Sequence, residues 1–444
     1  MKDKNAPSFP QRTKRYAHVA GAAVSTGVGV AGGRLFHGVD RQNEAVLLRA
    51  ALGRLKGPLM KIGQLLAAIP DFLPREYAAE LTTLQASAPP MGWPFVRRRM
   101  ATELGADWQK KFDSFEKTAR HAASLGQVHY ARHLDGRALA CKLQYPDMGS
   151  VMDADLQQLK IILGLFERFS GVLSTDEIFA EIAQRLREEL DYVREARNMA
   201  LYWDALASMP EVHVPQVAKE LSTPHLLCMD WLEGEGLDAV IQTRNQEDRN
   251  RIASNLFRLW YTPFYACGAL HGDPHPGNYT FCSDGSVNLL DFGCIRIFEP
   301  EVVQAVILLY RALRDNDSSQ VVHAYELWGF NHPSKELIEA LNIWAHFIYA
   351  PFLDDRSRPL EATNATTLGR RAASRIYQEL KKIGGVSVPR GFVMMDRASI
   401  GLGSVFLRLG AEVNWFTLFN EMTEDFDFQT FSDNQKEALE KHDF

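Results

Sequence analysis

Three polar residues in the second half of the chain have the types and the spacing of a phosphoryl-transfer site. Asp273 lies in His271-Gly-Asp-Pro-His-Pro-Gly-Asn278, and a second acid opens the tripeptide Asp291-Phe-Gly. In kinase-type enzymes one carboxylate orients the nucleophile, while an amide oxygen and another carboxylate hold magnesium on the nucleotide phosphates. The pattern therefore indicates Asp273 as the catalytic carboxylate, with Asn278 and Asp291 as the metal ligands.

The chain between these two motifs predicts a β-hairpin. Residues 279–282 and 287–290 have strand-like composition, and Ser283-Asp-Gly-Ser between them is a turn sequence. Such a hairpin would carry the amide of Asn278 and the carboxylate of Asp291 to one edge. Each motif alone is weak, and their order and separation make the combination informative.

A lysine in apolar surroundings is the candidate phosphate contact. Ala138-Leu-Ala-Cys-Lys142 reads as a buried strand that ends in lysine. A buried charge needs a partner, and in kinases this lysine binds phosphate and pairs with a helix glutamate. Glu195 is the candidate partner. The alternative is a lysine that reaches solvent at the strand end, with Glu195 on an ordinary charged helix face.

Other segments fit the binding of a nucleotide base and phosphates. Backbone groups from Asp230 to Leu232 are candidates to bind adenine, with Met229 behind it; an ordinary strand and turn is the alternative. No Gly-x-Gly-x-x-Gly precedes Lys142. Small residues stand there instead and would still let backbone N–H groups approach phosphate oxygens: Ala122, Ala123 and Ser124.

Composition bounds the class of protein. The 444 residues fit a two-lobed body with an extension, and the net charge of −6 gives no basic field for nucleic acid. Five cysteines without a Cys-x-x-Cys pair favour a reducing compartment. Residues 16–33 lack charge but are rich in glycine and alanine, so a loose extension and a membrane-surface segment both stay open.

The pattern of apolar residues predicts an α+β protein. Helices are expected over 43–69, 74–86, 94–104, 151–172 and 176–206, and strands over 112–119, 124–134, 138–144, 212–217 and 225–231. We expect a flexible segment (1–38), a helical extension (39–106), an N-lobe with a sheet (107–233) and a mainly helical C-lobe (234–444). The acidic tail from residue 421 is expected to be partly mobile.

Lys61-Ile-Gly-Gln64 has no role in an ordinary kinase, so it indicates a more specific group of proteins. Together with the Ala-Ala-Ser loop, the Glu189-x-Asp191 pair and the loop around Asp273, it resembles the UbiB/AarF family of atypical kinase-like proteins over about residues 40–420. The resemblance implies a bilobal protein-kinase-like fold in which the extension carrying Lys61 and Gln64 packs over the active site. Glu189 and Asp191 would face that extension. Residues two apart do not share a face of a regular helix, so a distortion is one expectation there.

The resemblance implies ATP and Mg²⁺ as cofactors. It also implies a role in ubiquinone biosynthesis, by action on a small or lipid-like substrate or by ATP hydrolysis. Expected partners are a nucleotide, a quinone precursor or lipid, a membrane surface and other quinone-biosynthesis proteins, without nucleic acid; a homodimer is left open. We expect a cytoplasmic location, with attachment to the inner membrane open. The alternatives are a small-molecule phosphotransferase of the aminoglycoside or choline kinase type and a nucleotide-binding pseudokinase scaffold.

Overall fold

A computed structural model of the chain describes residues 90–122, 125–170, 175–330, 332–360 and 390–444. These residues group into two compact units, and each is described by itself. The first contains the described residues up to Val193 together with Ala218–Trp231. The second contains Arg194–Val217 and the described residues from Leu232 to Phe444. The expected helices over 43–69 and 74–86, with Lys61 and Gln64, lie outside the described residues.

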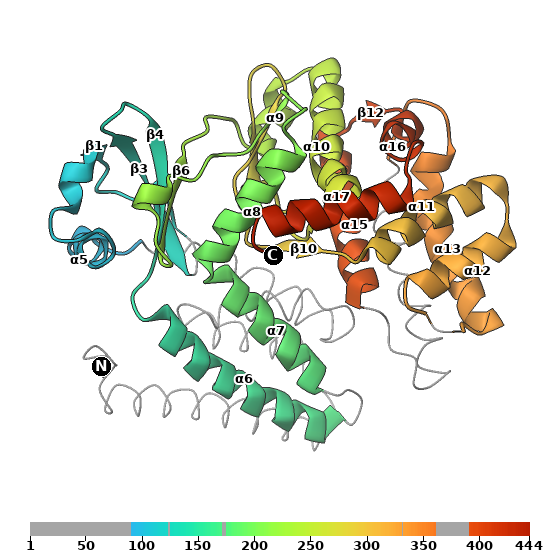
Figure 1. Cartoon of the computed structure of the whole chain (residues 1–444), viewed down its shortest axis with the longest axis horizontal. Coiled ribbons are helices and arrows are strands. Elements are labelled where there is room, and N and C mark those ends of the chain that lie inside the picture. Colours follow the sequence, from blue (N-terminus) through green and yellow to red (C-terminus); the bar gives the residue numbers. More distant parts are fainter. Residues whose placement is uncertain (1–89, 123–124, 171–174, 331, 361–389) are drawn as a thin grey trace, which may run out of the picture. The chain divides into compact units, whose positions relative to one another are not determined.

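The first unit is built on an antiparallel sheet of strand order β1-β3-β4-β6, with short β2 paired to β3 (Figure 1). Its strands are β1 (Phe112–Phe115), β2 (His121–Ala122), β3 (Gly126–His133), β4 (Ala138–Gln144) and β6 (Leu226–Asp230). Its helices are α5 (Trp93–Leu104), η1 (Trp108–Lys111), α6 (Met148–Ser170), α7 (Thr175–Glu189) and η2 (Lys219–Leu221). The predicted strand over 138–144 is confirmed with the same ends, and the strands over 124–134 and 225–231 are confirmed but shorter.

One face of this sheet packs into a hydrophobic core under α5. Leu139, Cys141 and Leu143 alternate along β4 and are fully buried with Trp108 and Met100. The period of two along a strand places the intervening residues, which include Lys142, on the opposite face. The register therefore separates packing residues from the candidate phosphate-binding lysine.

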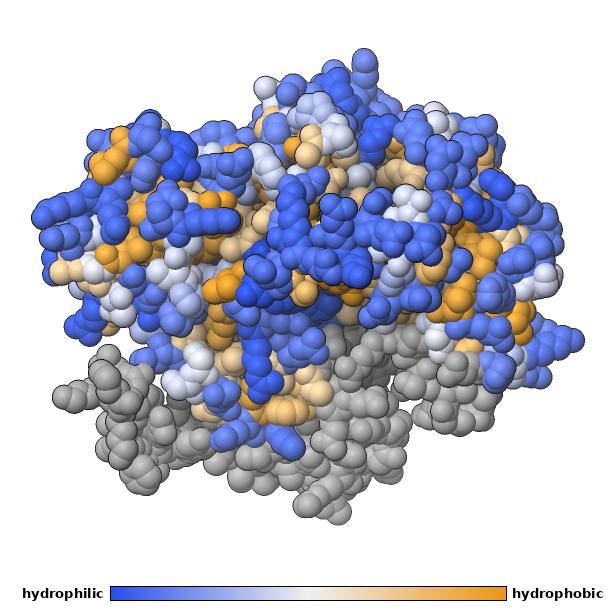
Figure 2. Space-filling model, viewed as in Figure 1, coloured by the Kyte–Doolittle hydropathy of each residue, from blue (hydrophilic) through white to orange (hydrophobic). Residues whose placement is uncertain are grey.

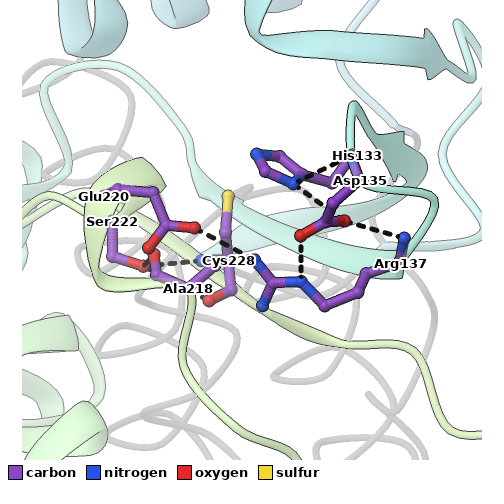
Figure 3. A network of polar contacts seen from close by, with 7 residues as sticks. All are labelled: His133, Asp135, Arg137, Ala218, Glu220, Ser222 and Cys228. Carbon is purple, nitrogen blue, oxygen red and sulfur yellow. Dashed lines mark hydrogen bonds and ion pairs between the residues drawn. The ribbon is translucent and has the colours of Figure 1, made fainter.

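The β3–β4 turn is held to the segment before β6 by a polar network (Figure 3). Asp135 accepts a hydrogen bond from Arg137 Nε at 2.7 Å, and Arg137 Nη2 lies 3.2 Å from Glu220 Oε1. The Arg137 backbone N–H and guanidinium lower the pKa of the Asp135 carboxyl. Gly136 has a φ of +93°, which an Asp-Gly turn supplies readily. The predicted Asp135-Gly136 hairpin turn is confirmed.

The second unit is mainly helical with short strand pairs. Its helices are α8, which begins at the boundary (Tyr192–Ala205), α9 (Leu237–Thr243), α10 (Gln246–Cys267), η3 (Pro276–Asn278), α11 (Pro300–Asp315), α12 (Ser318–Leu327), α13 (Lys335–Tyr349), η4 (Ala350–Leu353), α15 (Arg390–Leu409), α16 (Trp415–Thr423) and α17 (Phe428–Lys441). Its strands are β5 (Val212–His213), β7 (Ala269–His271), β8 (Tyr279–Phe281), β9 (Val287–Leu289), β10 (Ile295–Ile297), β11 (Arg358–Pro359) and β12 (Glu412–Val413). Figure 2 shows its surface as mostly hydrophilic, with apolar residues emerging around α12 and α13.

Two sequence predictions need correction. The helix predicted over 176–206 is two helices, because α7 ends at Glu189 and α8 begins at Tyr192. The acidic tail was expected to be mobile, and this was wrong, since its last part forms α17. Phe431 and Gln435 of α17 are buried, and Gln435 Nε2 donates to the carbonyls of Cys267 and Phe298. The burial of the apolar side of α17 stabilises the helix, although the segment is acidic.

Among the described residues, none of the helices combines the length and apolar character that crossing a membrane requires. The uncharged segment 16–33 lies outside them. All five cysteines are free, as their spacing predicted, and Cys141 and Cys228 are buried with their sulfur atoms 3.5 Å apart.

Candidate active site

The predicted hairpin is confirmed and joins the candidate catalytic loop to the second acid. β8 pairs antiparallel with β9, with Tyr279 opposite Leu289 and Phe281 opposite Val287. The backbone N–H of Leu290 donates to the carbonyl of Asn278 at 2.8 Å. Asn278 therefore lies beside Leu290, the residue that precedes Asp291, although Asn278 and Asp291 are thirteen positions apart in the sequence.

Asn278 also binds the candidate catalytic carboxylate. Its Nδ2 donates to the Asp273 backbone carbonyl at 3.0 Å and to Asp273 Oδ2 at 3.1 Å. Because the amide nitrogen faces Asp273, the amide oxygen is the atom on the other side, and oxygen is the atom that magnesium binds. Both residues are partly exposed. The loop between them is closed by His275, whose Nδ1 accepts the N–H of Gly277 at 3.0 Å.

His271 links the two acids through a buried imidazole. Its Nδ1 accepts the backbone N–H of Asp273 at 3.1 Å, so its Nε2 carries the proton and donates to the Asp291 carbonyl at 2.9 Å. Burial lowers the pKa of His271, which keeps the ring neutral as this bonding requires. Trp260 stacks near the ring and donates to the His271 carbonyl at 3.0 Å.

The Asp291-Phe-Gly turn is fixed on both sides. Asp291 Oδ1 accepts the N–H of Gly293 at 3.1 Å, which orients the carboxylate. Asn198 of α8, itself buried, donates from Nδ2 to the Phe292 carbonyl at 2.6 Å. The Phe292 ring packs edge-on against Tyr202 at 5.7 Å between centroids. The predicted metal ligands therefore rest on a packed, hydrogen-bonded frame.

Sequence reasoning missed His271 and Asn198 as positioning residues. In the sequence His271 is identified only as part of the loop motif, and the motif alone does not predict that its side chain positions other residues. Asn198 carried one usable signal, which is its place three residues after Glu195 in an amphipathic helix. A polar residue on the buried side of a helix needs a fixed partner, and here the partner is the Phe292 carbonyl.

The candidate phosphate lysine lies in the first unit. Lys142 pairs with Val128 and Leu227 in the sheet register, and its Nζ lies 5.3 Å from the centroid of the Tyr192 ring. An aromatic face attracts an ammonium group. Met229 is buried opposite Ala140, on the same face of the sheet as Lys142.

The start of β3 lies very close to the end of β4. Ala122 pairs with Gln127, while Ala123 and Ser124 lie outside the described residues. A Cβ at Gly126 would come within 2.7 Å of the Leu143 carbonyl oxygen and 3.1 Å of the Tyr192 hydroxyl. Only glycine allows this approach without a shift of the strands.

The remaining predicted residues lie at the boundary between the units or beside it. Asp230 ends β6, and the division of the chain falls between Trp231 and Leu232. Glu195 belongs to the second unit and is buried in the first turn of α8.

The acidic pair lies at the break between α7 and α8, which is one of the two alternatives open for residues two apart; the other was that each contacts a different part of the extension. Glu189 ends α7 and Asp191 precedes α8. Gln144 Nε2 donates to the Leu190 carbonyl between them at 2.6 Å, so the sheet stabilises the break.

An aspartate bound by an asparagine five residues later, joined through a hairpin to an Asp-Phe-Gly turn, is the arrangement expected of a kinase-like protein. The chain matches the ABC1 atypical kinase-like domain over residues 83–325, more than half of its length, and it belongs to this family, the UbiB/AarF family.

Two relatives and one solved structure show the extent of the similarity. "Atypical kinase COQ8, mitochondrial" of Saccharomyces cerevisiae is 32% identical, covering 62% of this chain and 54% of the relative. "Protein ACTIVITY OF BC1 COMPLEX KINASE 7, chloroplastic" of Arabidopsis thaliana is 30% identical, over 64% and 41%. The chain thus spans about half the length of these relatives or less. The Rv3197–erythromycin complex from Mycobacterium tuberculosis aligns with a TM-score of 0.60 at 27% identity, over 84% of this chain and 93% of that one.

Proposed function

We propose that the protein is a magnesium-dependent, ATP-binding atypical kinase or ATPase. The observation that carries this is the joining of Asp273, Asn278 and the Asp291 segment around the buried His271. A non-catalytic protein has little need of a neutral buried histidine that fixes two acidic segments at once. Family membership supports the same assignment.

In this proposal Asp273 orients the nucleophile and accepts its proton, while Asn278 holds the Asp273 carboxylate in place. Asn278 Oδ1 and the Asp291 carboxylate would hold magnesium. One amide oxygen and one carboxylate suit this ion, which keeps several positions for phosphate oxygens and water. Magnesium supplies charge neutralisation on the phosphates when bound. The N–H of Gly293 keeps the Asp291 carboxylate turned in one direction.

Nucleotide phosphates would be contacted by Lys142, paired with Glu195, and by the small-residue loop Ala122–Ser124. The partly buried ammonium of Lys142 and its position on the sheet face of Met229 support this. Adenine would bind backbone groups of Asp230 to Leu232. Lys142 to alanine should therefore weaken ATP binding without changing the fold of the second unit.

Lys61 and Gln64 would restrict which phosphoryl acceptors can enter the active site. We propose that the extension carrying them packs over the active site and meets Glu189 and Asp191. The break between α7 and α8 supports a special role for this acidic pair, because it frees the two side chains from a common helical geometry. Large protein acceptors would be excluded, and a small or lipid-like substrate, or water, would be accepted.

We further propose that the protein supports ubiquinone biosynthesis at a membrane surface, as a cytoplasmic protein peripheral to the inner membrane. Support comes from the family and from its COQ8 relatives. The partners would be a quinone precursor or lipid and other proteins of quinone synthesis.

The test combines turnover in vitro with quinone profiles of a strain that lacks the gene. Wild type should turn over Mg-ATP without an added aminoglycoside or choline and should restore the quinone profile. Asp273→Asn should do neither, while the matched control Asp284→Asn, at an exposed carboxylate in the hairpin turn, should do both at the wild-type rate. Turnover only with a small polar acceptor would favour the phosphotransferase, and binding without turnover would favour the scaffold.

A further inference from the structure

The second unit contains an apolar cavity of about 130 Å³ that the proposed reaction does not use. Aromatic side chains dominate its wall, among them Phe257, Tyr261, Trp328, Trp344, Phe406 and Trp415. The volume is close to that of an apolar cavity of about 150 Å³ that binds benzene or xenon. Its size therefore fits one aromatic ring with up to three further heavy atoms.

Three lining residues also carry buried N–H groups. Arg358 Nε, Trp328 Nε1 and Trp415 Nε1 are buried, and no acceptor among the described residues reaches them. Because these nitrogen atoms have almost no accessible surface, they do not face the cavity, and the wall that meets an occupant is mainly apolar.

The charge of Arg358 is already balanced. Its Nη1 lies 3.4 Å from Asp354 Oδ2, and its Nη2 donates to the Ala350 carbonyl at 3.1 Å. Among the described lining residues Arg358 is the charged one. An anionic ligand would gain little from a compensated guanidinium and would lose its hydration in an aromatic wall, so the cavity favours an uncharged molecule.

The cavity shares its wall with the supports of the catalytic loop. Leu270 lines it and directly precedes His271. Ser399, Ile400, Leu402 and Gly403 of α15 line it as well, whereas Gly401 between them packs on Pro274 of the loop so closely that a Cβ would overlap the proline ring. A shift of α15 would therefore displace Pro274, which is next to Asp273 in the sequence.

We propose that this cavity binds a small uncharged molecule built on one ring, and that its occupancy orders the loop around Asp273 through α15. A filled cavity restores contacts that its lining lacks and restricts α15. The ligand binds only the folded unit, so it stabilises that unit by mass action.

Acetophenone is the probe, and benzoate, a charged molecule with the same number of heavy atoms, is its matched control. With the full chain, acetophenone should raise the Tm progressively with concentration, with a Kd of roughly 1 mM or tighter for a ligand of this size. At equal free concentration benzoate should give a smaller rise. Equal rises would overturn the preference for an uncharged ligand, and no rise with acetophenone would overturn the site.

Two variants of α15 test whether the ligand binds in this cavity. Gly403 lines the cavity, and a Cβ there meets no atom within 4 Å, so Gly403→Leu should fill the space without a clash. The acetophenone shift should disappear in Gly403→Leu and persist in Ser404→Leu, which adds the same side chain at an exposed neighbour. If Gly403→Leu does not fold, Gly403→Val serves the same purpose. Persistence of the full shift in a folded Gly403 variant would contradict the proposal.

Hydrogen exchange tests the coupling to the loop. Acetophenone should slow exchange in α15 and at Gly272, whose N–H donates to the Cys294 carbonyl, while β4 in the first unit stays unchanged. Protection of α15 without any change at Gly272 would overturn the coupling. None of these readouts requires ATP, so their failure leaves the proposed kinase function untouched.

Discussion

Replacing His271 by phenylalanine tests whether the imidazole holds the catalytic loop against the Asp291 segment. The ring packing on Trp260 would persist, but the Asp273 N–H and the Asp291 carbonyl would lose their partners. An unpaired buried group costs about 1–3 kcal/mol, and both of these are only partly buried. We therefore expect the low end of that range, about 1–1.5 kcal/mol for each, or about 2–3 kcal/mol of unfolding free energy in total.

Thermal unfolding followed by circular dichroism measures this loss. For a unit of about 200 residues, 2–3 kcal/mol corresponds to a decrease in Tm of roughly 4–12 °C. His323→Phe is the matched control, because His323 is exposed on α12 and should change the Tm by less than about 2 °C. A His271→Phe protein as stable as wild type would refute the linking role of the imidazole.

Four further predictions follow from the same geometry. Asp291→Asn should weaken Mg-ATP binding roughly 10–100-fold, measured by titration calorimetry, since it removes the metal-facing charge. Gly401→Ala should cost about 1–3 kcal/mol in chemical denaturation, because the new methyl group overlaps Pro274; Gly403→Ala on the same helix should not destabilise. Lowering the pH from 7.5 to 5.5 should lower the Tm. Burial depresses the folded-state pKa of His271 and His129, so the unfolded chain binds protons that the folded state excludes below about pH 6.5; His271→Phe should flatten this dependence. Lys61→Ala should change the rate or acceptor range of ATP turnover, and wild-type behaviour in every assay would argue against an occluding extension.

Local sequence signals predicted the parts of the fold that depend on neighbours in the chain. The β8–β9 hairpin and the Asp135-Gly136 turn follow from strand composition and turn chemistry, which act over a few residues. Helix periodicity raised the break at Glu189 and Asp191 only as one of two alternatives, since residues two apart do not share a helical face, and the helix predicted over 176–206 ran through it.

Features that depend on distant contacts could not be read in the same way. The tail forms a helix because Phe431 is buried and because Gln435 donates a hydrogen bond to a carbonyl that lies far away in the sequence. The bond from Asn198 to the Phe292 carbonyl spans 94 positions, so the residues identified as ligands were visible but their support was not. The aromatic cavity likewise brings together side chains from segments that have no common motif.

The most direct test of the proposed chemistry is calorimetric titration of ATP into the full chain with and without magnesium. Wild type should bind ATP far more tightly with magnesium present, and Asp291→Asn should lose most of that gain. Asp284→Asn, an exposed carboxylate in the turn of the same hairpin, should retain it. ATP binding that is equally tight without magnesium, or a magnesium gain that Asp291→Asn leaves unchanged, would contradict the assignment of this site.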